Sequence, residues 1–175
     1  QAAALLDDSG GTYAEALGLD LAKNTPSPLF RWLCASLLLS TRISADLAMK
    51  AAAALADAGW TTPDKMAAST WEKRTKVLNR AGYARYDEST SRRLAELCET
   101  LLGEYGGDLR RLRKKAGNDP ARERALLKEF KGIGDVGADI FCREVQVAWP
   151  ELHPCVDARA MKSAQRLGLA SSADD

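Results

Sequence analysis

The chain has few of the residues that mark metal-binding domains. It contains one histidine and four cysteines in 175 residues, and the cysteines form no C-x-x-C pair. Zinc ribbons and iron–sulfur loops need closely spaced ligands, so we expect neither metal site nor cofactor in these residues. Cys34, Cys98 and Cys142 have apolar neighbours and are predicted to be core thiols, whereas Cys155 is not assigned. This cysteine usage favours a reducing cytoplasm.

Long apolar runs are also missing. No run approaches about 18 residues, which excludes a membrane-spanning helix, and the start Gln1 to Leu6 has neither the basic flank nor the cleavage pattern of a signal peptide. We therefore expect a cytoplasmic protein, nucleoid-associated if bacterial, without membrane contact. The missing initial Met and the polar end 171–175 suggest that the native polypeptide continues at both ends.

Strand-forming runs of Val, Ile and Thr are scarce, while Ala, Leu, Arg, Lys and Glu dominate. With 46% hydrophobic residues the chain can bury a sizeable core, so the sequence predicts an all-α fold. We divide it into an N-terminal helix and linker (1–27), a helical domain (28–169) and a polar tail (170–175). The expected helices cover Thr12 to Leu19, Leu29 to Ser40, Ser44 to Ala58, short segments from Thr62 and Thr70, Glu88 to Tyr105, Ala121 to Phe130, Val136 to Val147 and Asp157 to Leu167.

Charge is nearly balanced, with a formal net charge of +1, so any polyanion-binding surface must come from local arrangement. Seven basic residues stand against two acids between Arg110 and Arg124. Such a cluster can track a phosphate backbone. A solvated helix face with its loop is an equally acceptable interpretation of this run.

The most informative motif is Phe130 to Asp139, with glycines at 132, 134 and 137, followed by Pro154-Cys155-Val156-Asp157-Ala158-Arg159. Two helices joined by a Gly-hydrophobic-Gly turn expose unpaired backbone N–H groups, and glycine permits close approach of a phosphate. An Asp at a helix start has the simpler role of an N-cap, which competes with any catalytic interpretation of Asp157.

Three patterns together resemble the helix-hairpin-helix DNA glycosylase superfamily, and in particular its endonuclease III-like members. They are Leu37 to Asp46, Ala81 to Tyr86, and the hairpin with Val156 to Arg159 and the ending Arg166-Leu167-Gly168-Leu169. The resemblance covers about Pro28 to Leu169 and implies a helical bundle, arranged as two lobes around a cleft. It also implies binding of damaged or mismatched duplex DNA by a monomer, extrusion of a base and excision of that base.

By this resemblance, the hairpin holds DNA through backbone N–H groups that read no sequence. The expected DNA contacts are Lys131, Gly132, Ile133, Gly134, Val136, Gly137 and Arg159. Arg42 stands where many relatives carry a Gln that fills the space left by the flipped base, and Tyr83 or Arg85 lies where a second wedge enters. The alternative makes Tyr83 and Tyr86 core residues and Arg42 a surface charge.

Asp157 matches the family's catalytic carboxylate, which stabilises positive charge on the sugar or positions water. Bifunctional members carry a hairpin Lys that attacks the sugar, and here that position is Val136, which cannot act as a nucleophile. The resemblance therefore implies a monofunctional glycosylase. The alternatives are a DNA-binding protein of the same fold without catalysis, and an abasic-site lyase that uses a displaced amine, Lys131 or Lys162. The family's iron–sulfur motif would lie beyond the last residue of this chain.

The same resemblance leaves His153 as either a substrate contact or a solvent-facing loop residue. A deep pocket beside Asp157 would favour the enzyme, and a salt-bridged Asp157 would favour binding alone.

Overall fold

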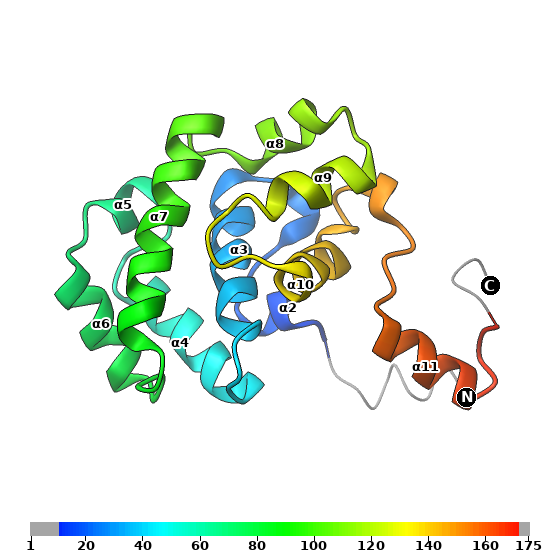
Figure 1. Cartoon of the computed structure of the whole chain (residues 1–175), viewed down its shortest axis with the longest axis horizontal. Helices are drawn as coiled ribbons and strands as arrows, with labels where there is room; N and C mark the ends of the chain where they lie inside the picture. The colour runs from blue at the N-terminus through cyan, green and yellow to red at the C-terminus, as the bar shows by residue number, and fades with distance from the viewer. Residues whose placement is uncertain (1–10, 172–175) are drawn as a thin grey trace.

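A computed structural model describes residues 11–171, and in this part of the chain every regular element is a helix (Figure 1). The α-helices are α2 (Tyr13–Ala16), α3 (Pro26–Leu39), α4 (Ala45–Asp57), α5 (Pro63–Ala67), α6 (Trp71–Arg80), α7 (Asp87–Tyr105), α8 (Leu109–Ala116), α9 (Pro120–Leu127), α10 (Asp135–Val145) and α11 (Ala158–Arg166). Two 3₁₀ helices, η1 (Leu21–Lys23) and η2 (Pro150–Leu152), lie between them. The all-α prediction is confirmed. Over residues 11–171 no helix has the length and apolar character needed to cross a bilayer.

Helix α3 is the centre of the core. Its residues from Trp32 to Leu38 are all buried, and the helix packs against α4, α8 and α10. The indole N–H of Trp32 donates to the Phe141 carbonyl over 3.2 Å, which ties α3 directly to α10. Because α3 is buried around most of its circumference, it fixes both α10 and the loop 40–44 that leaves its C-terminal end.

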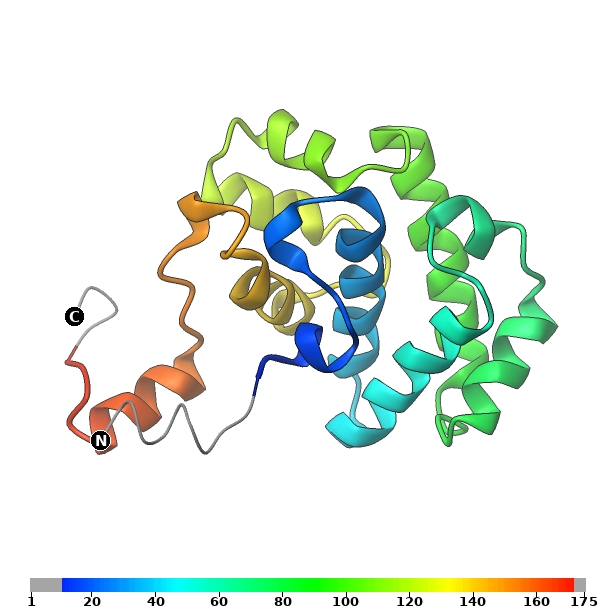
Figure 2. The same cartoon turned by 180° about the vertical axis from the view of Figure 1, so that it is seen from behind.

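Helices α4 to α7 form one side of the molecule, with α7 packed against α5 and α6 (Figure 1). The N-terminal segment crosses the opposite side, over α10 (Figure 2). There the Glu144 carboxylate accepts hydrogen bonds from the backbone N–H groups of Tyr13 (3.1 Å) and Ala14 (2.7 Å). The Trp149 indole N–H donates to the Asn24 side chain over 3.1 Å. These contacts attach α10 and the segment that follows it to the N-terminal part of the chain.

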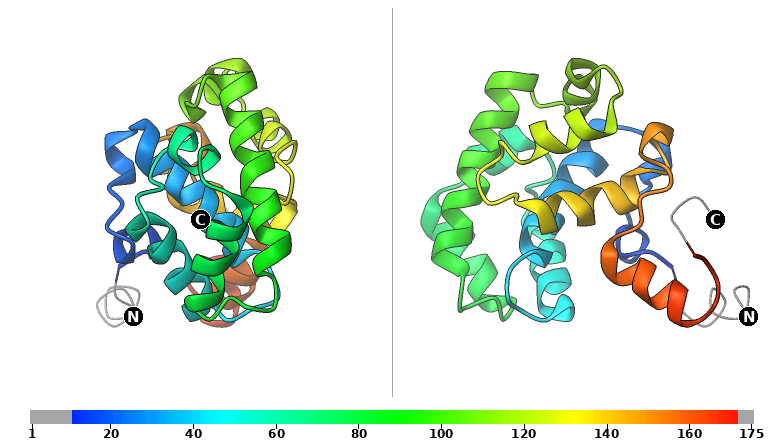
Figure 3. Two further views of the ribbon diagram at one scale, coloured as in Figure 1. Left: turned by 90° about the vertical axis from the view of Figure 1, so that its left-hand side faces the viewer. Right: turned by 45° about the vertical axis from the view of Figure 1, so that its right-hand side comes forward.

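Helices α9 and α10 lie side by side, and the turn 128–134 joins them (Figure 3, right). This is the helix-hairpin-helix unit that the motif from Phe130 predicts. The last helix, α11, begins one residue after Asp157 as predicted, but none of its residues is buried. The predicted tail 170–175 and the start Gln1 to Leu6 lie largely or wholly outside the described residues.

Candidate nucleic-acid interface

Two apolar side chains anchor the hairpin turn to the core. Phe130 is 1% exposed and Ile133 is 3% exposed. Between them Gly132 has φ +93°, a conformation that favours glycine, and a Cβ there would lie 2.9 Å from Cδ of Arg93 and 3.2 Å from Cδ1 of Leu37. Glycine at position 132 therefore allows the turn to close onto α3 and α7.

The turn leaves several backbone N–H groups without partners. Within residues 11–171 the N–H groups of Gly132, Gly134, Val136 and Gly137 donate to no acceptor, as expected where a helix begins. Gly134 is the N-cap of α10, and the space where its Cβ would stand is open. The positive end of the α10 dipole adds to the attraction for an anion. The N–H of Ile133 is different: it donates to the Phe130 carbonyl over 3.0 Å, so the predicted contact through Ile133 is wrong.

A hollow of about 530 Å³ lies between this turn and the loop that follows α3. It brings together five residues that the sequence predicted for DNA binding: Arg42, Gly132, Gly134, Val136 and Gly137. It also contains five that were not predicted: Ser40, Thr41, Tyr86, Arg93 and Asp135. Val136 is 60% exposed, an unusual position for a large apolar side chain. The hollow is therefore lined by residues whose N–H groups are free and by an apolar side chain at the start of α10.

Tyr83 is fully buried, which contradicts its predicted role as a DNA wedge. Its hydroxyl bonds to the Thr41 hydroxyl over 2.5 Å and donates to the Leu38 carbonyl over 3.2 Å, so this tyrosine fastens the loop after α3 to the core. Burial raises the pKa of the Tyr83 hydroxyl. Tyr86 lines the hollow instead, and the exposed Arg85 guanidinium lies 5.4 Å from the Tyr86 ring centre.

Of the charged residues that line the hollow, the two arginines are unpaired within residues 11–171 and the one acid is paired. Arg42 and Arg93 form no ion pair or hydrogen bond within the described part of the chain. Asp135 faces the same hollow, and Lys128 Nζ lies 2.8 Å from its carboxylate. The Lys128 hydrogen bond lowers the pKa of Asp135, which therefore stays ionised. Two free guanidinium groups thus share the site with one carboxylate.

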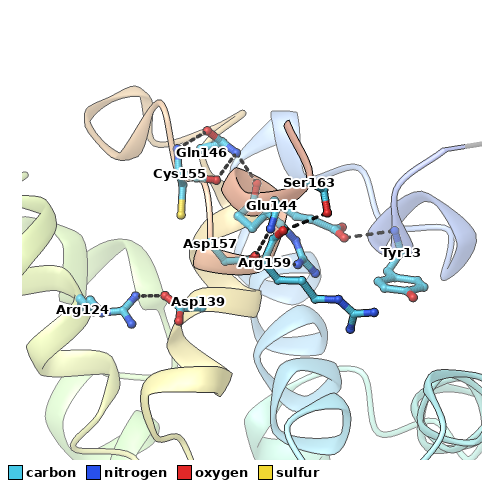
Figure 4. A network of polar contacts seen from close by, with 11 residues as sticks. Tyr13, Arg124, Asp139, Glu144, Gln146, Cys155, Asp157, Arg159 and Ser163 are labelled. Atoms are coloured by element: carbon cyan, nitrogen blue, oxygen red, sulfur yellow. Dashed lines mark hydrogen bonds and ion pairs between the residues drawn. The ribbon is translucent and has the colours of Figure 1, made fainter. Parts of the chain in front are cut away.

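Asp157 is both an N-cap and a salt-bridged residue. One carboxylate oxygen accepts from the Ala160 N–H over 2.7 Å, and the other lies 2.9 Å from the Arg143 guanidinium. The Ala160 N–H lowers the pKa of Asp157, and Arg143 lowers it further. Figure 4 shows Asp157 at the start of α11, close to Arg159 and Ser163.

Asp157 does not line the hollow. Its partner Arg143 follows Val136 by two helical turns of α10, so the two residues share a face about 10 Å apart along the helix axis. The carboxylate therefore lies along the face of α10 that begins at the hollow, beyond its edge. Lys131, Arg159 and Lys162 are exposed and also lie outside the hollow, as does His153, which is exposed in its loop.

Four of the seven basic residues in the cluster 110–124 form ion pairs. Arg110 pairs with Asp108 (2.7 Å), Arg113 with Glu151 (2.5 Å), Lys115 with Glu104 (3.5 Å) and Arg124 with Asp139. Most of the cluster lies on α8, a helix that the sequence pattern did not predict. These pairs favour the interpretation as a solvated helix face.

The predicted core positions of Cys34, Cys98 and Cys142 are confirmed by their burial. Burial raises the pKa of the Cys98 and Cys142 thiols to about 12. The four cysteines lie on α3, on α7, on α10 and in the loop before Asp157, so in residues 11–171 they offer no set of thiolates that fits an iron–sulfur cluster.

Comparison with known proteins defines the fold as endonuclease III-like and all-α. The chain is similar to the solved structure of a trapped endonuclease III–DNA covalent intermediate, an estranged-adenine complex, with a TM-score of 0.52 and 22% identity. The match covers 82% of this chain and 58% of that one, so the chain spans little more than half the length of the structure it resembles. No family model matches the chain, and neither does any curated protein.

Proposed function

We propose that this chain binds duplex DNA at the hollow between the hairpin and the loop after α3. The observation that carries this proposal is the convergence of free N–H groups at Gly132, Gly134 and Val136 with the unpaired guanidinium of Arg42. Backbone N–H groups and a guanidinium both bind phosphate oxygens, and such contacts position a protein on DNA without reading its sequence. Arg42 has the length and charge to bond an orphaned base.

We further propose that the bound DNA loses a damaged or mismatched base through hydrolysis of its N-glycosidic bond. The bond from the base to the sugar C1′ breaks, a water oxygen bonds to C1′, and the base leaves with a proton. Positive charge develops on the sugar during this step. Asp157, whose low pKa keeps it ionised, would stabilise that charge once DNA brings the sugar to the α10 face. Val136 offers no amine, so the expected product is an intact strand with an abasic site.

A second candidate is DNA binding without catalysis. It is favoured by the ion pair of Asp157 with Arg143 and by the position of Asp157 outside the hollow. In this case Asp157 serves only to cap α11 and to attach it to α10.

The test is to incubate the native chain and Asp157→Asn with duplexes that carry uracil, oxidised, alkylated or mismatched bases, and to measure free base and strand breaks separately. Asparagine is also a good N-cap, so this variant keeps α11 in place. Release of base that Asp157→Asn loses, without strand breaks, supports the monofunctional glycosylase. Tight binding with neither product supports the second candidate.

Strand breaks would point to a lyase with a displaced amine. A borohydride-trapped complex that disappears in Lys131→Gln or in Lys162→Gln would then identify the amine.

A further inference from the structure

Of the cations on the hairpin, Lys128 and Arg124 are paired with acids, and Lys131 is exposed but does not line the hollow. Lys128 Nζ lies 2.8 Å from Asp135, and Arg124 pairs with Asp139 and lies 3.9 Å from Asp135 (Figure 4 shows the Arg124–Asp139 contact). A hairpin that binds phosphate only through N–H groups must also overcome the Asp135 carboxylate in the same hollow. Positive charge at the hollow therefore comes from other elements, of which Arg42 in the loop after α3 is one.

Arg93 on α7 supplies a guanidinium at that place. Its side chain packs against the turn, since Cδ of Arg93 lies 2.9 Å and Cγ 3.4 Å from the position of a Cβ on Gly132. The stem of Arg93 therefore occupies the space that glycine leaves, and the residue lines the hollow beside Gly132 and Gly134. Its guanidinium forms no ion pair or hydrogen bond with residues 11–171.

We propose that Arg93 is a phosphate-binding residue of the DNA site, acting together with the N–H groups of the hairpin. The inference rests on the proposed DNA binding at the hollow and assigns to α7 a contact that the hairpin motif does not contain. A guanidinium presents donors in a rigid fork and matches two oxygens of one phosphate. Arg93 and the N–H groups can then hold the same phosphate from two sides, and Arg93 offsets the charge of Asp135.

The test is the salt dependence of binding, because a lost phosphate contact changes it and a merely structural change does not. Fluorescence anisotropy would follow a labelled duplex that carries one tetrahydrofuran abasic-site analogue, from about 50 to about 200 mM NaCl. For Arg93→Gln we expect affinity to fall about tenfold and the slope of log Kobs on log[NaCl] to become shallower by about 0.9. Arg93→Lys keeps the charge, so it should keep the slope while losing part of the affinity.

Arg92→Gln is the matched control, because Arg92 is the next residue of α7, is exposed and does not line the hollow. It should behave like the native chain, and circular dichroism should show that all variants keep their helices. An Arg93→Gln variant with native affinity, or one with lower affinity and the native slope, would overturn the inference.

Failure of the proposed DNA binding would give a different result from failure of the Arg93 inference. Gly134→Asp would then bind the duplex as tightly as the native chain does, whatever Arg93→Gln does. A native chain that did not bind the duplex at all would overturn both proposals.

Discussion

Asp135 is an acid in a hollow whose other features favour an anion. Its side chain is 72% exposed, lines the hollow and stands at the first position of α10. An acid at this position stabilises the helix through its dipole but repels a phosphate that approaches the same N–H groups. We therefore expect Asp135 to stabilise the helix and, if the hollow binds DNA as proposed, to lower the affinity for it.

We therefore expect Asp135→Asn to raise affinity for duplex DNA by about threefold to tenfold, because it removes a like charge and releases Lys128. Anisotropy with the abasic-analogue duplex measures this. Asp20→Asn is a suitable control, since Asp20 is also exposed and paired with a lysine, Lys23 at 3.1 Å, but does not line the hollow. Unchanged or weaker binding by Asp135→Asn would show that phosphate does not approach α10 here.

Single residues show what local sequence can predict. The N-cap at Asp157 and the glycine turn follow from chain-local rules, and both are present. Tyr83 and Tyr86 share one aromatic turn, and only packing against α3 decides that Tyr83 enters the core while Tyr86 meets the hollow. Arg93 was not predicted because it differs from its neighbour Arg92 only in the face of α7 on which it lies. The helical period gives that face, but it does not show which part of the molecule packs against it.

At the scale of elements, the hairpin depends on two glycines with different roles. Gly132 is required by its positive φ and by its contact with Arg93 and Leu37, whereas Gly134 has φ −101° and open space beside it. Position 132 therefore determines stability, and position 134 determines access to the N–H groups.

We expect Gly132→Ala to lower the free energy of unfolding by roughly 1–3 kcal/mol, since alanine must adopt a strained φ and displace its neighbours. Gly134→Ala should cost less, about 0.5–1 kcal/mol, because its φ is ordinary and alanine is only a poorer N-cap than glycine. Urea unfolding followed by circular dichroism compares the two. Equal stabilities for both variants would contradict the turn geometry.

Helix positions were largely predictable, and the departures have local causes. The helix starts expected at Ser44, Thr62 and Thr70 are confirmed, and each of these side chains accepts a hydrogen bond from the backbone N–H of the third residue of its helix. The helix expected from Leu29 begins earlier, at Pro26, so the two prolines form its first turn. There the missing N–H of proline costs nothing, because the first N–H groups of a helix have no helical acceptor. Helix α8 was not predicted because its basic residues were interpreted only as a charge cluster.

At the scale of the whole molecule, a buried acid on α9 lies close to charged residues of α8 and η2. Glu123 on α9 is fully buried, and neither of its carboxyl oxygens accepts a hydrogen bond. Its charged neighbours are Glu151 on η2, Arg113 on α8 and Asp119 at the start of α9. Burial and, after it, the neighbouring Glu151 raise the pKa of Glu123 to about 8, while Glu151 itself lies 2.5 Å from Arg113. Near neutral pH Glu123 is therefore largely protonated.

This shift makes stability depend on pH. The folded pKa lies above the ordinary value of 4.5, so stability is complete below that value and is lost as pH rises toward about 8. Glu123→Gln removes this loss and should be more stable than the native chain by roughly 1–3 kcal/mol at about pH 9, with a smaller difference at about pH 5. Thermal unfolding across this range measures it, with the exposed Glu129→Gln as control. Parallel pH profiles for Glu123→Gln and the native chain would contradict it.

The relative placement of distant segments is what the sequence could not predict. The motif spacing indicates that the hairpin and Asp157 belong to one site, yet the position of Asp157 beyond the hollow depends on the loop 146–157 and on its pairing with Arg143. That pairing joins residues of two helices through tertiary packing, which no local pattern specifies.

The most direct measurement compares duplex binding by the native chain, Gly134→Asp and Gly134→Asn. Both side chains fit the open space at an N-cap position and favour the helix start, so they differ only in charge. We predict tight binding by the native chain, modest weakening by Gly134→Asn and a loss of at least about tenfold by Gly134→Asp, because its carboxylate occupies the phosphate position. Native affinity in Gly134→Asp would contradict the central claim that the hairpin holds DNA.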